Sequence, residues 1–489
     1  MKRYLYLIAL LLVFTSCNKF LDVQPQSQID KNELFKTEEG FREALNGIYT
    51  SCASSSLYGG QLTFNFLDVM AQNYQFNDVQ LQDIANFNYN NPQVKSMGVE
   101  VWSAGYQAIT NCNYLLESID KDKSIFSPGI YELIKGETLA LRAYLHFDLC
   151  RMFAPSYLAG QAQKGIPYVT HTGITTTPFY PVGAVMDSVI RDLTAAKALL
   201  KQDPVIYSNY KVGYPSDEVS TELAFKDLLV QNRRHHLNYY AVCGELARVY
   251  LYKSDYANSL ANAEEVIISN KFPFTKQEDF FETDLTKRDH IFYPELIAGW
   301  FIDTKDENAY LKGKFTNQAP QFSGTVDQVN DIYEIGNVGG DDWRLKQWFL
   351  TTASVTGGPD RAVLQKYYRT TDPLPNLHPQ VAPAIRLSEM YYIAAEASFP
   401  TDPQKALDYF NIVRAQRGIG AAVDNVSADE FRELLLKEAR KEFYGESQMF
   451  FMYKRLHHGV AVSATNTRPP SNGIFVFPIP DDELAYRNN

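Results

Sequence analysis

The apolar residues of this chain change their spacing along the sequence and so divide it into segments. Between Glu38 and Tyr49, the residues Phe41, Leu45 and Ile48 follow the 3.6-residue period of a helix with one apolar face. The same period occurs in further stretches, which are 102–119, 130–153, 185–200, 237–253, 255–269, 385–398, 403–417, 428–444 and 448–456. The pattern predicts a mostly α-helical protein.

Two long segments lack this period. Residues 50–98 carry glycines and Pro92 among many Asn, Gln and Tyr residues, which is the composition of loops. Residues 271–384 are rich in Gly and Pro, and their apolar runs His290–Phe292 and Leu296–Phe301 are candidate strands. We therefore expect a loop-rich, partly β insertion between two helical regions. Loops held on a rigid scaffold commonly carry binding sites.

Two pairs of predicted helices resemble the tetratricopeptide repeat, in which small residues stand where two helices meet. The first pair carries Ala241 and Gly244 in its first helix. The second pair has Ala406 and Phe410, at the A-x3-F spacing of the repeat, directly after a turn at 401–403. Small residues let two helices approach closely, and the aromatic ring fills the next groove. The predicted fold is thus a tetratricopeptide-like helical-repeat scaffold that carries the insertion.

The amino terminus reads as an export signal. Lys2 and Arg3 precede the apolar run Leu5–Phe14, which has the length of a secretory signal and is too short to cross a bilayer as a helix. Small residues then stand directly before Cys17. We interpret residues 1–16 as a lipoprotein signal peptide and Cys17 as the lipidated residue, followed by a tether at 17–36. The alternative is an ordinary secretory signal with a chance cysteine.

Composition and charge narrow the class of partner. The apolar fraction of 45% is that of a globular protein, and the formal net charge of −11 disfavours nucleic acid as a partner. The remaining cysteines, Cys52, Cys112, Cys150 and Cys243, lie far apart, and buried free thiols are favoured over the three disulfide pairings that they allow. We expect no cofactor and no metal. Calcium could bind the Asp-rich loops, but no ligand spacing supports it.

The sequence lacks the short motifs of common enzymes. It has no G-x-S-x-G elbow, no H-E-x-x-H pair, no phosphate-binding loop and no dinucleotide fingerprint. Adjacent acids such as Asp341–Asp342 and Asp481–Asp482 stand in turn-like sequence, where carboxylates are usually solvated. We therefore expect a protein that is not an enzyme.

Aromatic and amide residues in the loops are the candidate ligand contacts. The aromatic fraction is 13%, with 32 Tyr residues, and a tyrosine side chain offers both an apolar face and a hydroxyl, which suits partly hydrated binding surfaces. The candidates are Asn73, Tyr74, Asp78 and Tyr89 in the first loop segment, and Tyr310 and Trp343 in the insertion. Trp102, on a periodic helical face, and Trp300, at the end of an apolar run, are assigned to the core.

Short motifs in a fixed order run through most of the chain. They are Cys17–Asp22, Trp102 with Tyr106, Ile109 and Asn113, Glu137–Tyr144, Arg386–Ala397, Ala406–Gly418, Glu438–Glu442 with Gly445, Lys454–Leu456, and Pro478–Pro480 with Glu483. In this order they resemble the SusD/RagB family, the surface lipoproteins of Bacteroidetes nutrient-uptake systems.

The resemblance implies a function and an organisation. It implies a surface-exposed, lipid-anchored outer-membrane protein that binds oligosaccharides and delivers them to a TonB-dependent SusC-like transporter. The SusD-like parts would be a helical region with ligand loops at 37–270, the loop-rich insertion at 271–384 and a helical region at 385–489. Two alternatives remain open, which are peptide ligands in the same role and a periplasmic lipoprotein scaffold that binds only other proteins.

Overall fold

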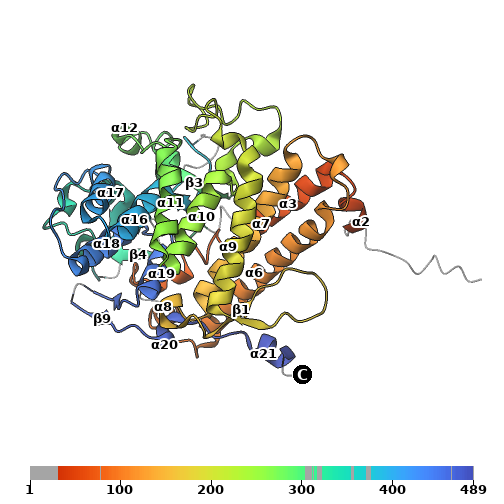
Figure 1. Ribbon diagram of the computed structural model, residues 1–489. Coiled ribbons are helices and arrows are strands. Elements are labelled where there is room, and N and C mark those ends of the chain that lie inside the picture. Colours follow the sequence, from red (N-terminus) through yellow and green to blue (C-terminus); the bar gives the residue numbers. More distant parts are fainter. Residues whose placement is uncertain are drawn as a thin grey trace, which may run out of the picture.

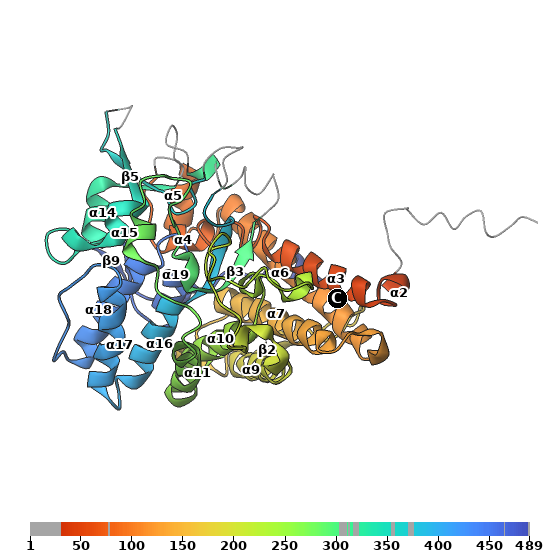
Figure 2. The ribbon, with the colours of Figure 1, turned by 90° about the horizontal axis from the view of Figure 1, so that it is seen from above.

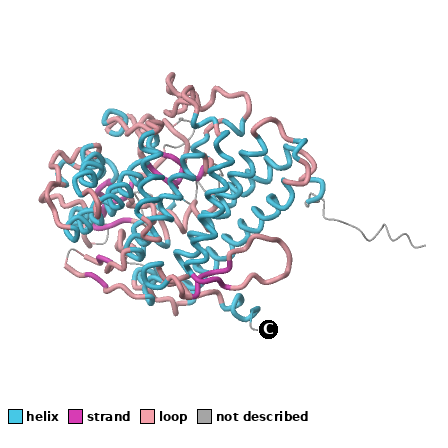
Figure 3. Tube along the Cα trace, in the orientation of Figure 1, coloured by secondary structure: helices cyan, strands magenta, loops and turns pink. Residues whose placement is uncertain are grey.

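The computed structural model describes residues 31–76, 79–302, 311, 313–315, 322–353, 357–369, 376–463 and 465–487, and most of its regular structure is helical (Figures 1 and 3). The longer helices are α3 (Glu38–Cys52), α6 (Pro92–Ile119), α7 (Ile130–Phe153), α9 (Val182–Leu199), α10 (Tyr239–Tyr252), α11 (Tyr256–Ile268), α16 (Leu387–Ser398), α17 (Pro403–Ala415), α18 (Ala428–Glu442) and α19 (Gln448–Arg455). The shorter helices are α2 (Lys31–Leu34), α4 (Phe66–Met70), α5 (Val79–Ala85), α8 (Tyr157–Gly160), α12 (Gln277–Phe280), α14 (Val326–Ile332), α15 (Trp343–Trp348), α20 (Asn472–Phe475) and α21 (Asp481–Arg487).

Local sequence explains where the helices begin. Helix α6 is longer than predicted because Pro92 occupies its first turn, where no backbone N–H is needed, and the Asn91 side chain accepts hydrogen bonds from the Gln93 and Val94 amides. Helix α7 has the predicted bounds, and nearly every one of its residues from Ile134 to Phe153 is buried. A helix that is buried all round belongs at the centre of a helical array.

The longer helices pack in series. Helix α6 packs on α7, α7 on α9, α9 on α10, α10 on α11, α11 on α16, and α16 on α17. Figure 2 shows this series curving from α3, α6 and α7 on one side to α16, α17 and α18 on the other. The predicted pairs are the hairpins α10–α11 and α16–α17, which confirms a mostly α, tetratricopeptide-like scaffold.

The strands lie in small antiparallel sheets. They are β1 (Lys164–Pro167) with β2 (Phe179–Pro181), β3 (Leu296–Phe301) with β7 (Val381–Arg386), β4 (Ser323–Thr325) and β5 (Phe349–Thr352) on either side of β6 (Arg361–Leu364), and β8 (Val460–Ala461) with β9 (Thr467–Arg468). The run Leu296–Phe301 is a strand as predicted. The run His290–Phe292 is not, because Phe292 has a φ of 56° and a 3-10 turn follows it.

The core contains the tryptophans assigned to it. Trp300 is buried and stacks on Tyr58 with ring centroids 4.4 Å apart, and Trp102 is buried between α6 and α7 against Phe153. The cysteines Cys52, Cys112, Cys150 and Cys243 are free and buried, as favoured from the sequence.

The carboxyl-terminal segment packs onto the body. Phe475 and Phe477 are buried, and the Phe477 amide donates to the Met152 carbonyl at the end of α7. The buried Lys454 ammonium donates to the carbonyls of Ala154 at 2.5 Å and Phe475 at 2.7 Å. In the described part of the chain, no helix has both the length and the apolar character needed to cross a membrane.

Candidate functional site

A hollow of about 300 Å³ lies where the first loop segment meets the three-stranded sheet. Its described lining, which we call the polar hollow, consists of Gln72, Tyr74, Gln75, Phe76, Gln82, Ala85, Asn86, Thr325, Gly358, Pro359 and Arg361. Figure 2 places α5, which carries Gln82 and Ala85, and strand β5 of the sheet at one edge of the molecule, opposite the hairpins. The hollow thus joins two segments that are far apart in sequence.

One backbone hydrogen bond and several from side chains hold the two walls of the hollow together. The Gln75 amide donates to the Ser323 carbonyl at 3.0 Å, so the loop extends the edge strand β4. The Gln328 side chain donates to the Gln72 carbonyl at 3.1 Å. Arg361, on the adjacent strand β6, donates to the Ser323 carbonyl at 2.7 Å and to the Gln75 carbonyl. The loop is therefore fixed by the sheet rather than by its own sequence.

Aromatic rings form one side of the hollow. The Tyr74 ring is 3% exposed and packs against Phe322, at 5.2 Å between centroids, and Phe76, at 6.0 Å. Phe76 is half-buried and therefore presents part of its ring to solvent. Burial raises the pKa of the Tyr74 hydroxyl well above its ordinary value, so the group stays protonated.

A buried polar network lies behind this aromatic wall. The Asp68 carboxylate accepts hydrogen bonds from the Asn73 side chain at 3.1 Å and from the Gly445 amide at 3.0 Å. Burial raises the pKa of Asp68 to about 7, although these N–H donors favour its charged form. Arg440 donates to the Asn73 side-chain oxygen at 3.2 Å and to the Gln72 carbonyl at 2.7 Å. The turn after α18 thus supports the wall of the hollow.

Exposed amides form the rim. Gln82 donates to the Phe76 carbonyl at 2.9 Å, and Arg468 donates to the Asn86 side-chain oxygen at 2.7 Å. Both Gln82 and Asn86 are exposed, so each keeps hydrogen-bonding capacity for a bound molecule.

The structure separates the residues that the sequence offered as ligand contacts. Tyr74 lines the hollow, and Asn73 lies behind it with its amide engaged by Asp68 and Arg440. Tyr89 lies apart and donates to the Ile474 carbonyl at 2.5 Å.

Three further candidates cannot be placed, and one lies elsewhere. The half-buried Trp343 begins α15 and packs its ring edge-on to Phe281 at 5.9 Å, outside the lining of the hollow. Cys17, Asp78 and Tyr310 lie outside the described residues. Roles in ligand binding for Asn73, Tyr74, Asp78, Tyr89, Tyr310 and Trp343 stay predictions, as does lipidation of Cys17.

Several lining residues were not among those candidates. The density of amides between Gln72 and Asn86 was a usable signal, since four of them reach the hollow. Arg361 had no such signal, because only the pairing of β6 with β4 brings it to this loop.

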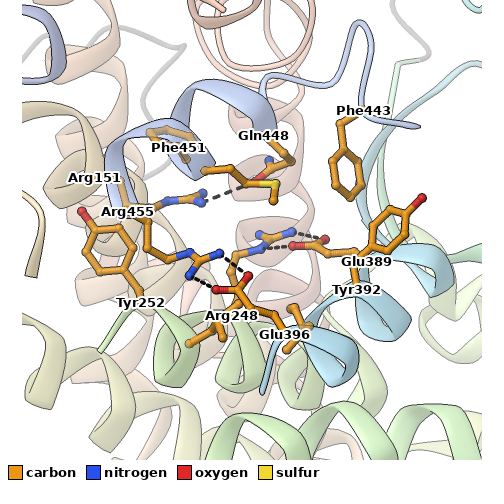
Figure 4. A pocket seen from close by; sticks show the side chains of 13 residues that line it. Arg151, Arg248, Tyr252, Glu389, Tyr392, Glu396, Phe443, Gln448, Phe451 and Arg455 are labelled. Carbon is orange, nitrogen blue, oxygen red and sulfur yellow. Dashed lines mark hydrogen bonds and ion pairs between the residues drawn. The ribbon is translucent and has the colours of Figure 1, made fainter. Parts of the chain in front are cut away.

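A second, smaller cavity lies between α7, α10, α16 and α19 (Figure 4). Its volume is about 50 Å³, which leaves room for a few water molecules and not for a sugar ring. Its charged side chains pair with each other, Arg248 with Glu389 at 2.7 Å and Arg455 with Glu396 at 2.6 Å. The polar hollow is therefore the better candidate for a ligand site. Among the described residues, no group of His, Cys, Asp and Glu side chains could hold a metal ion.

Comparisons with known proteins cover both ends of the chain. Residues 19–212 match the family model SusD-like_3, described as "Starch-binding associating with outer membrane", and residues 351–484 match the SusD family. The sequence is 22% identical to SusD-like protein P2 of Formosa agariphila, over 100% of this chain and 98% of that protein. It is 22% identical to SusD-like protein P38 of the same organism, over 94% and 91%.

Solved structures share the fold. A SusD-like carbohydrate binding protein from Bacteroides vulgatus superposes with a TM-score of 0.69 at 20% identity, over 92% of this chain and 97% of that one. A SusD superfamily protein from the same species superposes with a TM-score of 0.70 at 21% identity, over 93% and 98%. At this identity the likeness is one of fold.

Proposed function

We propose, for a chain that belongs to the SusD/RagB family, the capture of oligosaccharides at the outer membrane. The protein is anchored at the cell surface by lipid on Cys17. It holds the oligosaccharide in the polar hollow and delivers it to a TonB-dependent transporter of the SusC type. The family supports the association with the outer membrane and with carbohydrate, while the anchor, the transporter and the oligosaccharide are our proposals.

The chemistry of the polar hollow carries this proposal. Its volume is at the lower end of the range for small-molecule sites. Its lining combines the half-buried Phe76 ring, which packs on the buried Tyr74, with the exposed amides of Gln75, Gln82 and Asn86. An aromatic face suits the apolar C–H face of a sugar ring, and amides can donate to and accept from its hydroxyls. A peptide could use the same groups, but the family match favours carbohydrate.

The lining favours binding over chemistry. Hydrolysis of a glycosidic bond ordinarily uses two carboxyl groups on opposite sides of the bond. The described lining of the polar hollow contains Gln, Asn, Thr and Arg side chains and no Asp or Glu. Capture without reaction is the function that these groups support best.

The test is calorimetric titration of residues 18–489 with a panel of oligosaccharides and mixed peptides. We expect saturable binding of at least one oligosaccharide. Gln82→Ala should weaken it by roughly tenfold, because the substitution removes an exposed amide of the rim. Gln404→Ala is the matched control, since Gln404 is equally exposed and bonds only Asp408 on α17.

The outcomes separate the alternatives. Binding of peptides alone would overturn the oligosaccharide proposal in favour of peptide capture. Oligosaccharide binding that Gln82→Ala and Phe76→Ala leave unchanged would place the ligand outside the polar hollow. Absence of binding by both oligosaccharides and peptides would favour the alternative of a scaffold that binds only other proteins.

A further inference from the structure

The charged side chain in the polar hollow is a cation. Arg361 is half-buried, and no carboxylate of the described chain forms an ion pair with it. Its hydrogen bonds go to neutral acceptors, which are the Ser323 hydroxyl at 3.1 Å, the Ser323 carbonyl at 2.7 Å and the Gln75 carbonyl. Burial without a counter-charge lowers the pKa of this guanidinium, which still stays protonated. The site therefore holds an uncompensated positive charge.

Two further arginines lie near the polar hollow and also lack an ion pair with any carboxylate of the described chain. Arg440 donates to Asn73 and Gln72 behind the aromatic wall, and Arg468 donates to Asn86 at the rim. Their partners in the described chain are also neutral. One guanidinium group thus lines the hollow and two others contact its lining residues or the residue behind them, none with a carboxylate partner in the described chain.

The formal net charge of the molecule is −11, and half-buried Arg369 likewise bonds only neutral acceptors. The fully buried arginines, in contrast, are paired with acids. Arg344, Arg386 and Arg417 all reach the buried carboxylate of Glu442, at 2.8, 2.5 and 2.7 Å.

Of the acids near these residues in sequence that the structure describes, none forms an ion pair with Arg361, and Asp78 lies outside the described residues. Asp68 lies behind Tyr74, and burial raises its pKa to about 7, so that its charge is only partly present at neutral pH. Asp83 accepts from Asn88 at 2.9 Å and from Asn91 at 2.7 Å. Asp360 is exposed and lies outside the lining.

We propose that the polar hollow selects acidic oligosaccharides, with a uronate carboxylate or a sulfate ester of the ligand facing Arg361. This inference rests on the proposed function and adds the substrate class. An anion at this position would supply a counter-charge that the described residues do not provide, and a charge-assisted hydrogen bond is stronger than a neutral one. A neutral sugar would leave the half-buried guanidinium without a counter-charge.

The test compares oligosaccharides that carry negative charge with one that does not. Residues 18–489 are titrated with tetragalacturonate, with its fully methyl-esterified counterpart, and with a heparin-derived tetrasaccharide that presents sulfate. We expect at least one of the acidic ligands to bind more tightly than the ester, by about tenfold or more. Raising NaCl from about 50 to about 500 mM should weaken acidic ligands and leave the ester nearly unchanged.

Substitutions of Arg361 test whether this residue causes the preference for acidic ligands. Arg361→Gln should abolish the difference between acid and ester, and Arg361→Lys should retain part of it, since the charge remains without the planar fork. Arg432→Gln is the matched control, because that arginine is half-exposed and pairs only with Asp429 on the surface of α18. Should Arg361→Gln fail to fold, the comparison of acid and ester on the unaltered chain still decides.

Failure of this inference differs from failure of the proposed function. Equal binding of acid and ester, or tighter binding of neutral oligosaccharides such as maltotetraose, would overturn the acidic preference and leave oligosaccharide capture standing. Binding of an acidic peptide such as oligoglutamate with no oligosaccharide bound would overturn both. Absence of binding by every oligosaccharide would also overturn both the acidic preference and the proposed function.

Discussion

At the scale of single residues, buried charges in compensated clusters are the most consequential feature of this protein. Glu137 is fully buried in α7 and accepts from the Tyr49 hydroxyl at 2.7 Å. It also forms an ion pair with Arg233 at 2.6 Å and lies 2.9 Å from the His236 ring nitrogen. Although burial opposes its charge, these partners lower the pKa of Glu137 to about 2. Removing one member leaves the others buried and uncompensated.

The pH dependence of stability follows from that shift. An unfolded glutamate titrates near pH 4.5, so the stability from Glu137 is fully present above that pH and is lost as the pH falls towards about 2. Glu137→Gln should lower the free energy of unfolding by roughly 3–5 kcal/mol at pH 7. The difference between the wild type and the variant should narrow below about pH 4.5, as measured by urea unfolding at several pH values.

The control for this prediction is an exposed acid. Asp429 forms an ion pair with Arg432 on the surface of α18, and Asp429→Asn should change stability by less than about 1 kcal/mol. A difference in the free energy of unfolding between the wild type and Glu137→Gln that stays constant from pH 7 down to the lowest pH measured would contradict the argument from the ion pairs.

At the scale of elements, close helix packing depends on small residues at particular positions. Gly244 faces the second hairpin from α10, where an added Cβ would lie 2.9 Å from Ile385 and 3.3 Å from Met390, both of them buried. Gly47, in the exposed face of α3, has no atom within 4 Å of the same position. Substitution of these two glycines can therefore separate the effect of helix packing on stability from the effect of helix propensity.

Matched alanine substitutions test this reading. Gly47→Ala should raise the free energy of unfolding by about 0.5–1 kcal/mol, because alanine is the better helix former. Gly244→Ala should lose that gain to overpacking, which typically costs about 1–3 kcal/mol. Thermal and urea unfolding would measure both. Equal stabilisation by the two substitutions would show that α10 and α16 can move apart freely.

At the scale of the whole molecule, the carboxyl-terminal segment closes the core across elements from both halves of the chain. Phe477 packs against Phe66 at 5.1 Å, Phe153 at 5.8 Å and Phe450 at 6.0 Å between ring centroids. Lys454 on α19 donates to carbonyls at the end of α7 and to the Phe475 carbonyl. The segment therefore joins α4, α7 and α19.

Truncation measures how much the carboxyl-terminal segment contributes to the stability of the protein. Removing residues 471–489 should lower stability by several kcal/mol, since each buried Phe contributes about 1.5–3 kcal/mol and Lys454 loses an acceptor. Removing only 481–489 should have little effect, because α21 has no buried residue. Differential scanning calorimetry of the two truncated proteins provides the comparison, and similar losses from both would refute the role given to Phe475 and Phe477.

Much of the helical scaffold was predictable because its signals are local. The period of apolar residues gave α7 and α16–α19 to within a few residues, and small residues at 241–244 and 406 marked the hairpins. The short helices α4 and α5 within 50–98 were missed. They are too short for a clear period, and α4 is buried on all sides.

The sequence by itself determined the helical scaffold, the burial of Trp102 and Trp300, the free thiols and the family resemblance. Apolar periodicity and short motifs depend on residues close together in the chain. Only the tertiary structure decided the candidate site. In the structure Asn73 lies behind the aromatic wall, and Tyr89 and Trp343 lie outside the polar hollow. The pairing of β4 with β6 brings Arg361 to Gln75. The contacts of Tyr89 with Ile474 and of Arg361 with Gln75 join residues 385 and 286 positions apart. The spacing of residues along the chain carries no record of which distant segments meet.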